Sequence, residues 1–227
     1  MSELRATLRV ELLSGFHIQA GFGTGGLHQA MVRNAKRQPF IPASSLKGRL
    51  KFQAQRFANL LDVYGNEAMF ESFELLFGGA FQLGRLYLDN AILVEDAHQS
   101  EPLAQEVRAT NQIDRDTRTV TEGHLRFFET LPSTLKFETA LRLVLPEARA
   151  IDGDVDLLPT ECQTMVALLL GALRLCDQLG GGKTRGTGRI RLVHRDWTLA
   201  GKPLVEFPNA WFAAYLGGAL GMPEVAS

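Results

Sequence analysis

Glycine and basic residues are interleaved in residues 180–191, GGGKTRGTGRIR, and five of the nine residues from Gly180 to Gly188 are glycine. Glycine has no Cβ, so its backbone can adopt positive φ and bring N–H groups close to another molecule. Successive N–H groups in such turns form concave anion sites. Because Lys183 and Arg185 lie among these glycines, the segment predicts a phosphate-binding loop. The phosphate could belong to a nucleotide, a metabolite or a polynucleotide backbone.

A nucleotide-binding P-loop is disfavoured. Its pattern, G-x-x-x-x-G-K-[ST], is met at Gly182, Lys183 and Thr184, but Asp177 stands where the first glycine is required. The predicted order is also helix, glycines, strand, whereas a P-loop runs from strand to glycines to helix. The remaining alternative for the segment alone is a helix-to-strand connection whose basic residues are simply solvated.

The net charge of −1 hides an uneven distribution of charge along the chain. No acidic residue occurs between Glu11 and Asp62 or between Asp177 and Asp196. These two acid-free windows hold half of the 24 lysines and arginines: Arg33, Lys36, Arg37, Lys47, Arg49, Lys51 and Arg56 in the first, and Lys183, Arg185, Arg189, Arg191 and Arg195 in the second. The pattern predicts one positive face that could bind a polyanion, the alternative being chance clustering on a solvated surface.

Length and composition predict one domain over residues 1–227 with an ordinary hydrophobic core, since 45% of the residues are apolar. No apolar run approaches the ~20 residues of a membrane helix, and the N-terminus lacks a signal-peptide pattern, so we expect a cytoplasmic protein without a membrane partner. The five histidines have no metal-ligand spacing, and we expect no metal site. Cys162 and Cys176 are expected to be buried, unpaired thiols.

Hydrophobic periodicity predicts an α+β fold. Strands are expected at 3–13, 84–94, 134–145 and 188–198, helices at 42–61 and 159–179, a short amphipathic piece at 67–77, and a helix or packing arm at 204–220. Residues 96–112 are expected to be irregular, and residues 113–127 to form an extended hairpin arm, within an insertion spanning 96–132. The order β, α, β, arm, β, α, β is that of the split βαβ, ferredoxin-like arrangement.

Four segments resemble the RAMP proteins of CRISPR–Cas systems. FIPASSLKGRL (Phe40 to Leu50) resembles their IPGSSLKG signature, and LFGGAFQLGRLYLDNA (Leu75 to Ala91) resembles a glycine-containing segment that ends in a strand. IDRDTRT…FFETLP (Ile113 to Pro132) looks like their thumb region, and LGGGKTRGTGRIRL (Leu179 to Leu192) looks like their glycine-rich loop. The segments occur in the family's order, and the length and the arm favour a backbone subunit of a type III effector complex.

The resemblance implies a modified RRM-like fold with an inserted thumb hairpin. It implies three kinds of partner: a CRISPR guide RNA, complementary target RNA, and other RAMP subunits that stack along the guide. The thumb would insert into the guide–target duplex at regular intervals. The RNA-binding residues carried over by position are Ser44, Ser45, Lys47, Arg49, Gly181, Gly182, Lys183, Arg185, Gly186, Arg33 and Arg115.

The resemblance also bears on catalysis, because some members cut target RNA with an aspartate in the loop after the first strand. In their pattern, G-x-D-x-P-[VI]-x-R, setting Arg33 as the arginine puts His28 at the aspartate and Ala30 at the proline. We therefore expect a non-catalytic subunit without a cofactor. The first alternative is an Mg²⁺-dependent endoribonuclease that uses His28 as general acid or base, or Asp114 as the acid. The second is a guide-processing nuclease, for which His194 is the histidine near the glycine loop.

Overall fold

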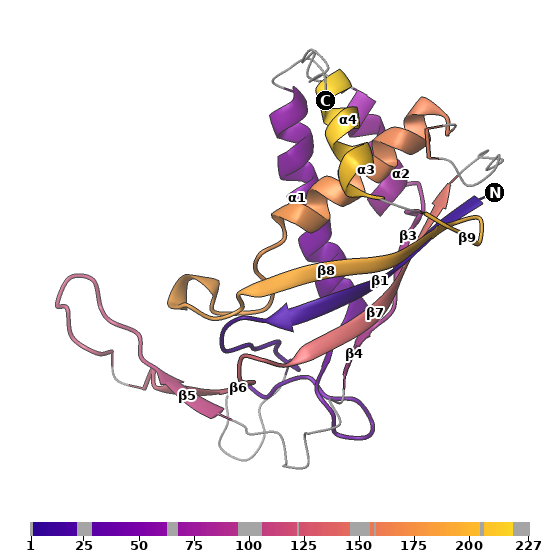
Figure 1. Cartoon of the computed structure of the whole chain (residues 1–227). Helices are drawn as coiled ribbons and strands as arrows, with labels where there is room; N and C mark the ends of the chain where they lie inside the picture. Colours follow the sequence, from indigo (N-terminus) through magenta and orange to yellow (C-terminus); the bar gives the residue numbers. More distant parts are fainter. Residues whose placement is uncertain are drawn as a thin grey trace.

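A computed structural model describes residues 2–21, 29–62, 68–94, 106–121, 123–145, 155–156, 158–204 and 207–219. An antiparallel sheet is covered on one face by helices, and a long hairpin arm projects from one end (Figure 1). The helices are α1 (Ala43–Asp62), α2 (Ala68–Phe77), α3 (Thr160–Leu175) and α4 (Asn209–Ala219), with a single 3-10 turn, η1, at Lys183–Arg185.

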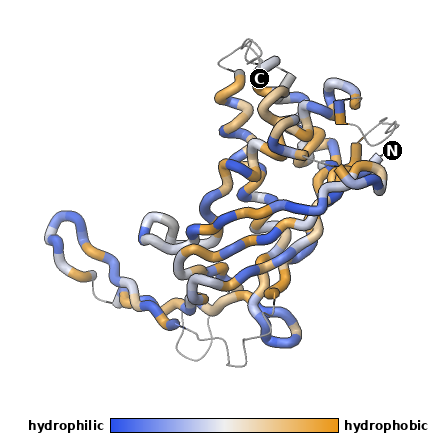
Figure 2. Tube along the Cα trace, in the orientation of Figure 1, coloured by the Kyte–Doolittle hydropathy of each residue, from blue (hydrophilic) through white to orange (hydrophobic). Residues whose placement is uncertain are grey.

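The sheet is built around β1 (Ser2–Leu12), whose period-two pattern buries Leu4, Leu8 and Val10 completely. This strand pairs antiparallel with β7 (Lys136–Leu145) and with β8 (Ile190–Leu199). The sheet order is β2-β4-β7-β1-β8-β9, with β3 also paired to β7, where β2 is Phe40–Ile41, β3 is Leu86–Leu88, β4 is Ala91–Leu93 and β9 is Lys202–Pro203. Figure 2 shows hydrophobic and hydrophilic residues alternating along these long strands, as expected for a sheet with one buried face.

The predicted strand 84–94 is two short strands, β3 (Leu86–Leu88) and β4 (Ala91–Leu93). Both pair with β7, and the break between them is held by Thr139, whose hydroxyl donates to the Asp89 carbonyl at 2.7 Å. Asn90, also in the break, accepts a hydrogen bond from the N–H of Ala43 at 2.9 Å. The first turn of α1 is thus capped by a side chain from another element, and not by the serines that follow Pro42. The edge strand β2 (Phe40–Ile41) leads into α1 and pairs with β4.

Helix α3 ends at Leu175, four residues before the predicted end at 179. Residues after Cys176 run beside the start of β8, where the N–H of Leu179 donates to Gly188 O at 2.8 Å. This pairing competes with helical hydrogen bonding and stops the helix. Cys162 and Cys176 are both buried, as predicted. Helix α3 lies between β7 and β8 in the chain. The strands and helices thus follow the order of a ferredoxin-like α+β fold, which confirms the predicted fold class.

The hairpin begins earlier than the predicted range 113–127, although it lies within the predicted insertion 96–132. Residues 106–110, predicted to be irregular, form β5 (Glu106–Thr110), which pairs antiparallel with β6 (Arg126–Thr130) in a separate two-stranded sheet. No side chain of β5 is fully buried, so the strand lacked the alternation that reveals a half-buried strand. The short strand β9 (Lys202–Pro203) forms a hairpin with β8. No helix in the described part of the chain is long and apolar enough to cross a membrane.

Candidate nucleic-acid interface

The glycine-rich loop is held against the segment that follows β1. Gly181 donates to the carbonyl of His17 at 2.9 Å, and Gly188 donates to the carbonyl of Gly15 at 2.8 Å. Gly180 has φ +85°, and a Cβ there would collide with the His17 carbonyl. Several N–H groups of the loop are therefore used within the fold, and the loop is shaped by these bonds before any ligand binds.

The outward-facing side of the loop is basic. The turn η1 is bracketed by Gly182 and Gly186, both in the left-handed region with φ +69° and +78°. Arg185 and Arg189 are exposed, and neither makes an ion pair with another described residue. The side chain of Lys183 lies outside the described part of the structure. These arginines can therefore reach a ligand without giving up an internal partner.

Arg49 links helix α1 to the start of this loop. Its Nε donates to the Gln178 carbonyl at 2.9 Å, and its guanidinium lies 3.9 Å from the Asp177 carboxylate. The guanidinium also sits over the ring of Phe52, 5.1 Å from the centroid. The side chain is only 14% exposed, so Arg49 holds the two basic windows together.

Lys47, two residues before Arg49 on α1, points to the other side of the helix. Its ammonium donates to the carbonyl of Leu86 in β3 at 2.8 Å. Burial lowers the pKa of Lys47 from its ordinary value, and the nearby charge of Lys51 lowers it further. Ser44 is exposed in the first turn of the same helix.

A groove of about 820 Å³ runs between α1, the glycine-rich loop and the segment after β1. Its walls come from four places in the sequence, and its lining residues are His17, Ile18, Gln19, Gln29, Ser45, Gly48, Arg49, Phe52, Leu179, Gly180 and Gly181. The two acid-free windows, about 130 residues apart in sequence (Arg49 and Gln178 are separated by 129), thus meet at one concave surface.

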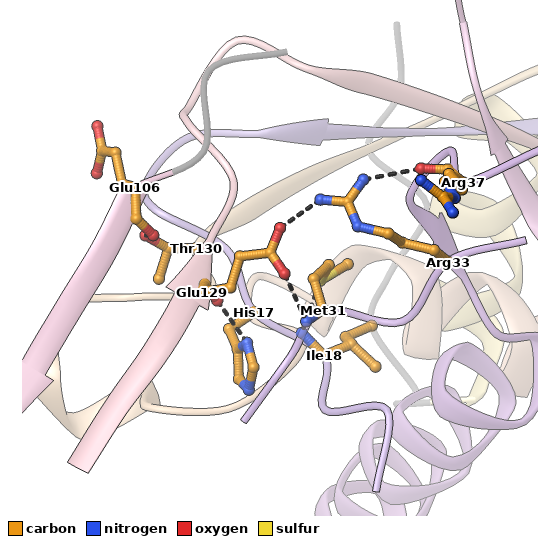
Figure 3. Close-up of polar contacts among 8 residues, drawn as sticks. All are labelled: His17, Ile18, Met31, Arg33, Arg37, Glu106, Glu129 and Thr130. Atoms are coloured by element: carbon orange, nitrogen blue, oxygen red, sulfur yellow. Dashed lines mark hydrogen bonds and ion pairs between the residues drawn. The ribbon is translucent and has the colours of Figure 1, made fainter. Parts of the chain in front are cut away.

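Arg33 is held within the fold by a cluster of polar contacts that also includes the groove residue His17 (Figure 3). Its guanidinium pairs with the carboxylate of Glu129, a 4% exposed residue at the base of the arm, and donates to the carbonyl of Arg37 at 2.8 Å. Glu129 also accepts from the N–H of Met31 at 2.9 Å, and its carbonyl accepts from Nδ1 of His17 at 2.6 Å. This cluster fixes the segment 29–33 and His17 against the arm.

The comparison with known protein families agrees with this arrangement. A family model described as "RAMP superfamily" matches residues 9–191, which span both walls of the groove and the arm. The chain belongs to the RAMP superfamily. This RAMP protein is 27% identical over 207 residues to the "CRISPR system Cms endoribonuclease Csm3" of Enterococcus italicus. The match covers 85% of this chain and 90% of that protein.

Solved structures share the fold of this RAMP protein at low sequence identity. A chain of the type III-B Cmr-beta complex bound to cognate target RNA, determined by cryo-electron microscopy, has a TM-score of 0.60 and 14% identity, covering 84% of this chain and 96% of that chain. A chain of the same complex in its apo state has a TM-score of 0.58 and 14% identity, with the same coverage.

Arg115 of this RAMP protein is exposed in the segment that joins β5 to β6, on the arm that projects from the sheet (Figure 1). Asp114 shapes this loop, because its carboxylate accepts from the N–H groups of Asp116 and Thr117, each at 2.9 Å. These backbone hydrogen bonds lower the pKa of Asp114. The carboxylate is thus used in the turn.

Of the three residues named in the catalytic alternatives, the structure describes Asp114 and His194. His28 lies outside the described residues, so its placement gives no test of the acid–base hypothesis. Among the described residues, no group of three or more His, Cys, Asp or Glu side chains could hold a metal ion. His194 accepts a hydrogen bond from Nε1 of Trp197 at 3.1 Å, and burial lowers its pKa, followed in effect by the charge of Arg174.

Sequence reasoning missed several groove residues of this RAMP protein, among them His17, Gln19, Gln29 and Phe52. His17 lies in the segment after β1, which ends at Leu12, so its place opposite the glycine-rich loop could have been found from the strand order, because β1 and β8 are neighbours in this fold. Phe52 left a signal too, as it departs from the buried face formed by Leu46, Leu50 and Phe57. The glutamines had no such signal, since their position depends on the fold of residues 17–33.

Proposed function

We propose that this chain is a guide-RNA-binding backbone subunit of a type III CRISPR–Cas effector complex, acting in antiviral defence in the cytoplasm. The observation that carries the proposal is the groove in which α1 and the glycine-rich loop meet, because the same loop also carries the exposed Arg185 and Arg189. A single-stranded RNA backbone supplies a row of phosphates for such a surface. The membership in the RAMP superfamily and the similarity to Csm3 support the same function.

The predicted RNA-binding residues lie in different parts of the fold, and we propose a different role for each part. Ser45, Arg49 and Gly181 line the groove, and Gly182, Lys183, Arg185 and Gly186 form the turn beside it. Ser44 is exposed at the N-terminal end of α1 and can reach the RNA strand that the groove binds. Arg33 and Lys47 act by positioning the walls. Arg115, on the arm, would contact the guide–target duplex and not the groove-bound strand.

Salt-dependent RNA binding tests this proposal. The full-length protein and an Arg185→Ala, Arg189→Ala variant would be titrated against a fluorescent single-stranded RNA at several salt concentrations. Loss of two phosphate contacts should flatten the slope of log affinity against log salt by about 1.4, as expected for a single strand. Arg56→Ala is the matched control, because Arg56 is exposed on α1 but does not line the groove. An unchanged slope in the double variant, or an equal change in the control, would contradict the proposed surface.

A second candidate function is target-RNA cleavage, because the Csm3 relative is named an endoribonuclease. This chain has no carboxylate from residue 12 to residue 61, the region where the family's catalytic aspartate is expected. Assembled complex would be incubated with labelled complementary RNA and Mg²⁺, with and without His28→Ala. Regularly spaced products that disappear in His28→Ala would favour the nuclease, and gain of cleavage in His28→Asp would support the alignment of His28 with that aspartate.

A further inference from the structure

We infer that the groove holds one nucleobase of the bound RNA, stacked on Phe52 and hydrogen-bonded along its edge by His17 and the groove glutamines. The inference rests on the proposed function and adds to it a base-binding subsite beside the phosphate-binding loop. Three observations carry it: an exposed aromatic ring fixed in place, an unpartnered buried acceptor, and a volume that fits a nucleotide.

Phe52 is an aromatic platform at the wall of the groove. Its side chain is 53% exposed although it lies in the middle of α1, and it lines the groove together with Ser45 and Arg49. Arg49, held by Gln178 and Asp177, lies over the ring. The ring is therefore oriented before ligand binds, and its uncovered surface can accept a base in the way that aromatic side chains bind single-stranded nucleic acid.

His17 supplies the second observation. The ring is 5% exposed, and its Nδ1 must carry the hydrogen that it donates to the Glu129 carbonyl, since a carbonyl only accepts. In the neutral ring, Nε2 is then an acceptor, and it is buried without a hydrogen-bond partner among the described residues. Figure 3 shows Nδ1 facing Glu129, with the rest of the ring turned away from it. An unsatisfied buried acceptor in a groove wall favours a ligand that donates, such as an exocyclic amine or a ribose hydroxyl.

The remaining walls suit a base better than a protein side chain. Gln19 and Gln29 each present an amide that can both donate and accept, as the edge of a base requires. The volume of about 820 Å³ is within the range of small-ligand sites. Gly180 and Gly181 of the glycine-rich loop line the groove, so a base in the groove would have its phosphates near the loop that carries Arg185 and Arg189.

Abasic RNA separates the stacking contact from the phosphate contacts. Wild type and Phe52→Ala would be compared on a single-stranded RNA and on the same RNA with abasic sites. We expect Phe52→Ala to lose about ten-fold in affinity for the normal RNA, since stacking on an aromatic ring contributes about one decade or more per base. It should lose nothing on abasic RNA and keep the wild-type salt slope, and Phe52→Tyr should restore binding.

Leu60→Ala is the control, because Leu60 is 58% exposed on the same helix but does not line the groove. Equal binding by wild type and Phe52→Ala, or an equal loss on both RNAs, would overturn the inference while leaving the proposed function intact. A Phe52→Ala protein with normal RNA affinity but altered self-association would also overturn it, since Phe52 would then pack against protein. If wild type binds neither RNA, the proposed function itself fails.

Discussion

The basic residues of the two acid-free windows form two groups that differ in their partners. Arg33, Lys47 and Arg49 are bound to Glu129, the Leu86 carbonyl, and Asp177 with Gln178, respectively. Arg185 and Arg189 are exposed and make no ion pair with a described residue. A window without acids in sequence therefore need not be free of acids in space, because the fold brings carboxylates from other elements. The first group builds the groove, and the second is available to RNA.

The largest loss of stability is expected for Glu129, the buried carboxylate that pairs with Arg33. Glu129→Gln removes the charge that pairs with Arg33 and weakens the acceptor for the Met31 N–H. Since the partner charge stays partly buried, the free energy of unfolding should fall by about 3 kcal/mol. Chemical denaturation would measure it.

Glu106→Gln provides the matched control in the arm. Its ion pair with Arg108 is roughly half exposed on both sides, so the change in unfolding free energy should stay below about 1 kcal/mol. Equal effects of the two substitutions would show that Arg33 does not depend on Glu129.

Two glycines of the loop sharpen the comparison at the backbone. Gly180 and Gly186 both have positive φ, but a Cβ at Gly180 would strike the His17 carbonyl, whereas one at Gly186 meets open space. Gly180→Ala should cost about 2 kcal/mol or more and weaken RNA binding, and Gly186→Ala should cost about 1 kcal/mol through backbone strain alone. Thermal unfolding and RNA titration of both variants would check the difference. If Gly186→Ala is the more damaging, the loop does not depend on its contact with His17.

A substitution of Lys47 tests whether a basic residue that is bound within the fold also contacts RNA. Lys47→Met keeps the aliphatic stem but removes the hydrogen bond to Leu86, so we expect a loss of about 1 kcal/mol in stability. The salt slope for RNA should remain that of the wild type. A flatter slope would show that Lys47 contacts a phosphate when RNA is bound, and would move it into the second group.

The smallest effect concerns His194, where burial in the fold favours the neutral ring. The pKa is lowered in the folded state, while the unfolded chain titrates near the ordinary value of 6.5. As pH falls below 6.5, the unfolded state takes up the proton first, so stability is lost on acidification and is fully present above that value. His194→Gln should have a flatter dependence of stability on pH between about 7 and 5. Parallel profiles for the two proteins would contradict the assignment.

The sequence predicted the elements that carry a strong hydrophobic period, and these include β1, β7, β8 and α1. The charge pattern predicted that the two acid-free windows share one face, and the groove does bring residues of both windows together. It could not predict which cations are used internally, because Glu129 reaches Arg33 only through the pairing of the arm with residues 29–33. It also missed β5, since a strand exposed on both faces has no alternation to detect.

The most direct test of the central claim is to purify the protein with its native complex and map the RNA that accompanies it. We predict that guide RNA co-purifies with the complex. Ultraviolet light should cross-link this RNA to the peptides that contain residues 44–52 and 180–189. Absence of RNA would contradict the claim. So would cross-links confined to Arg5, Arg142 and Arg191, which lie on the opposite face of the sheet from the helices.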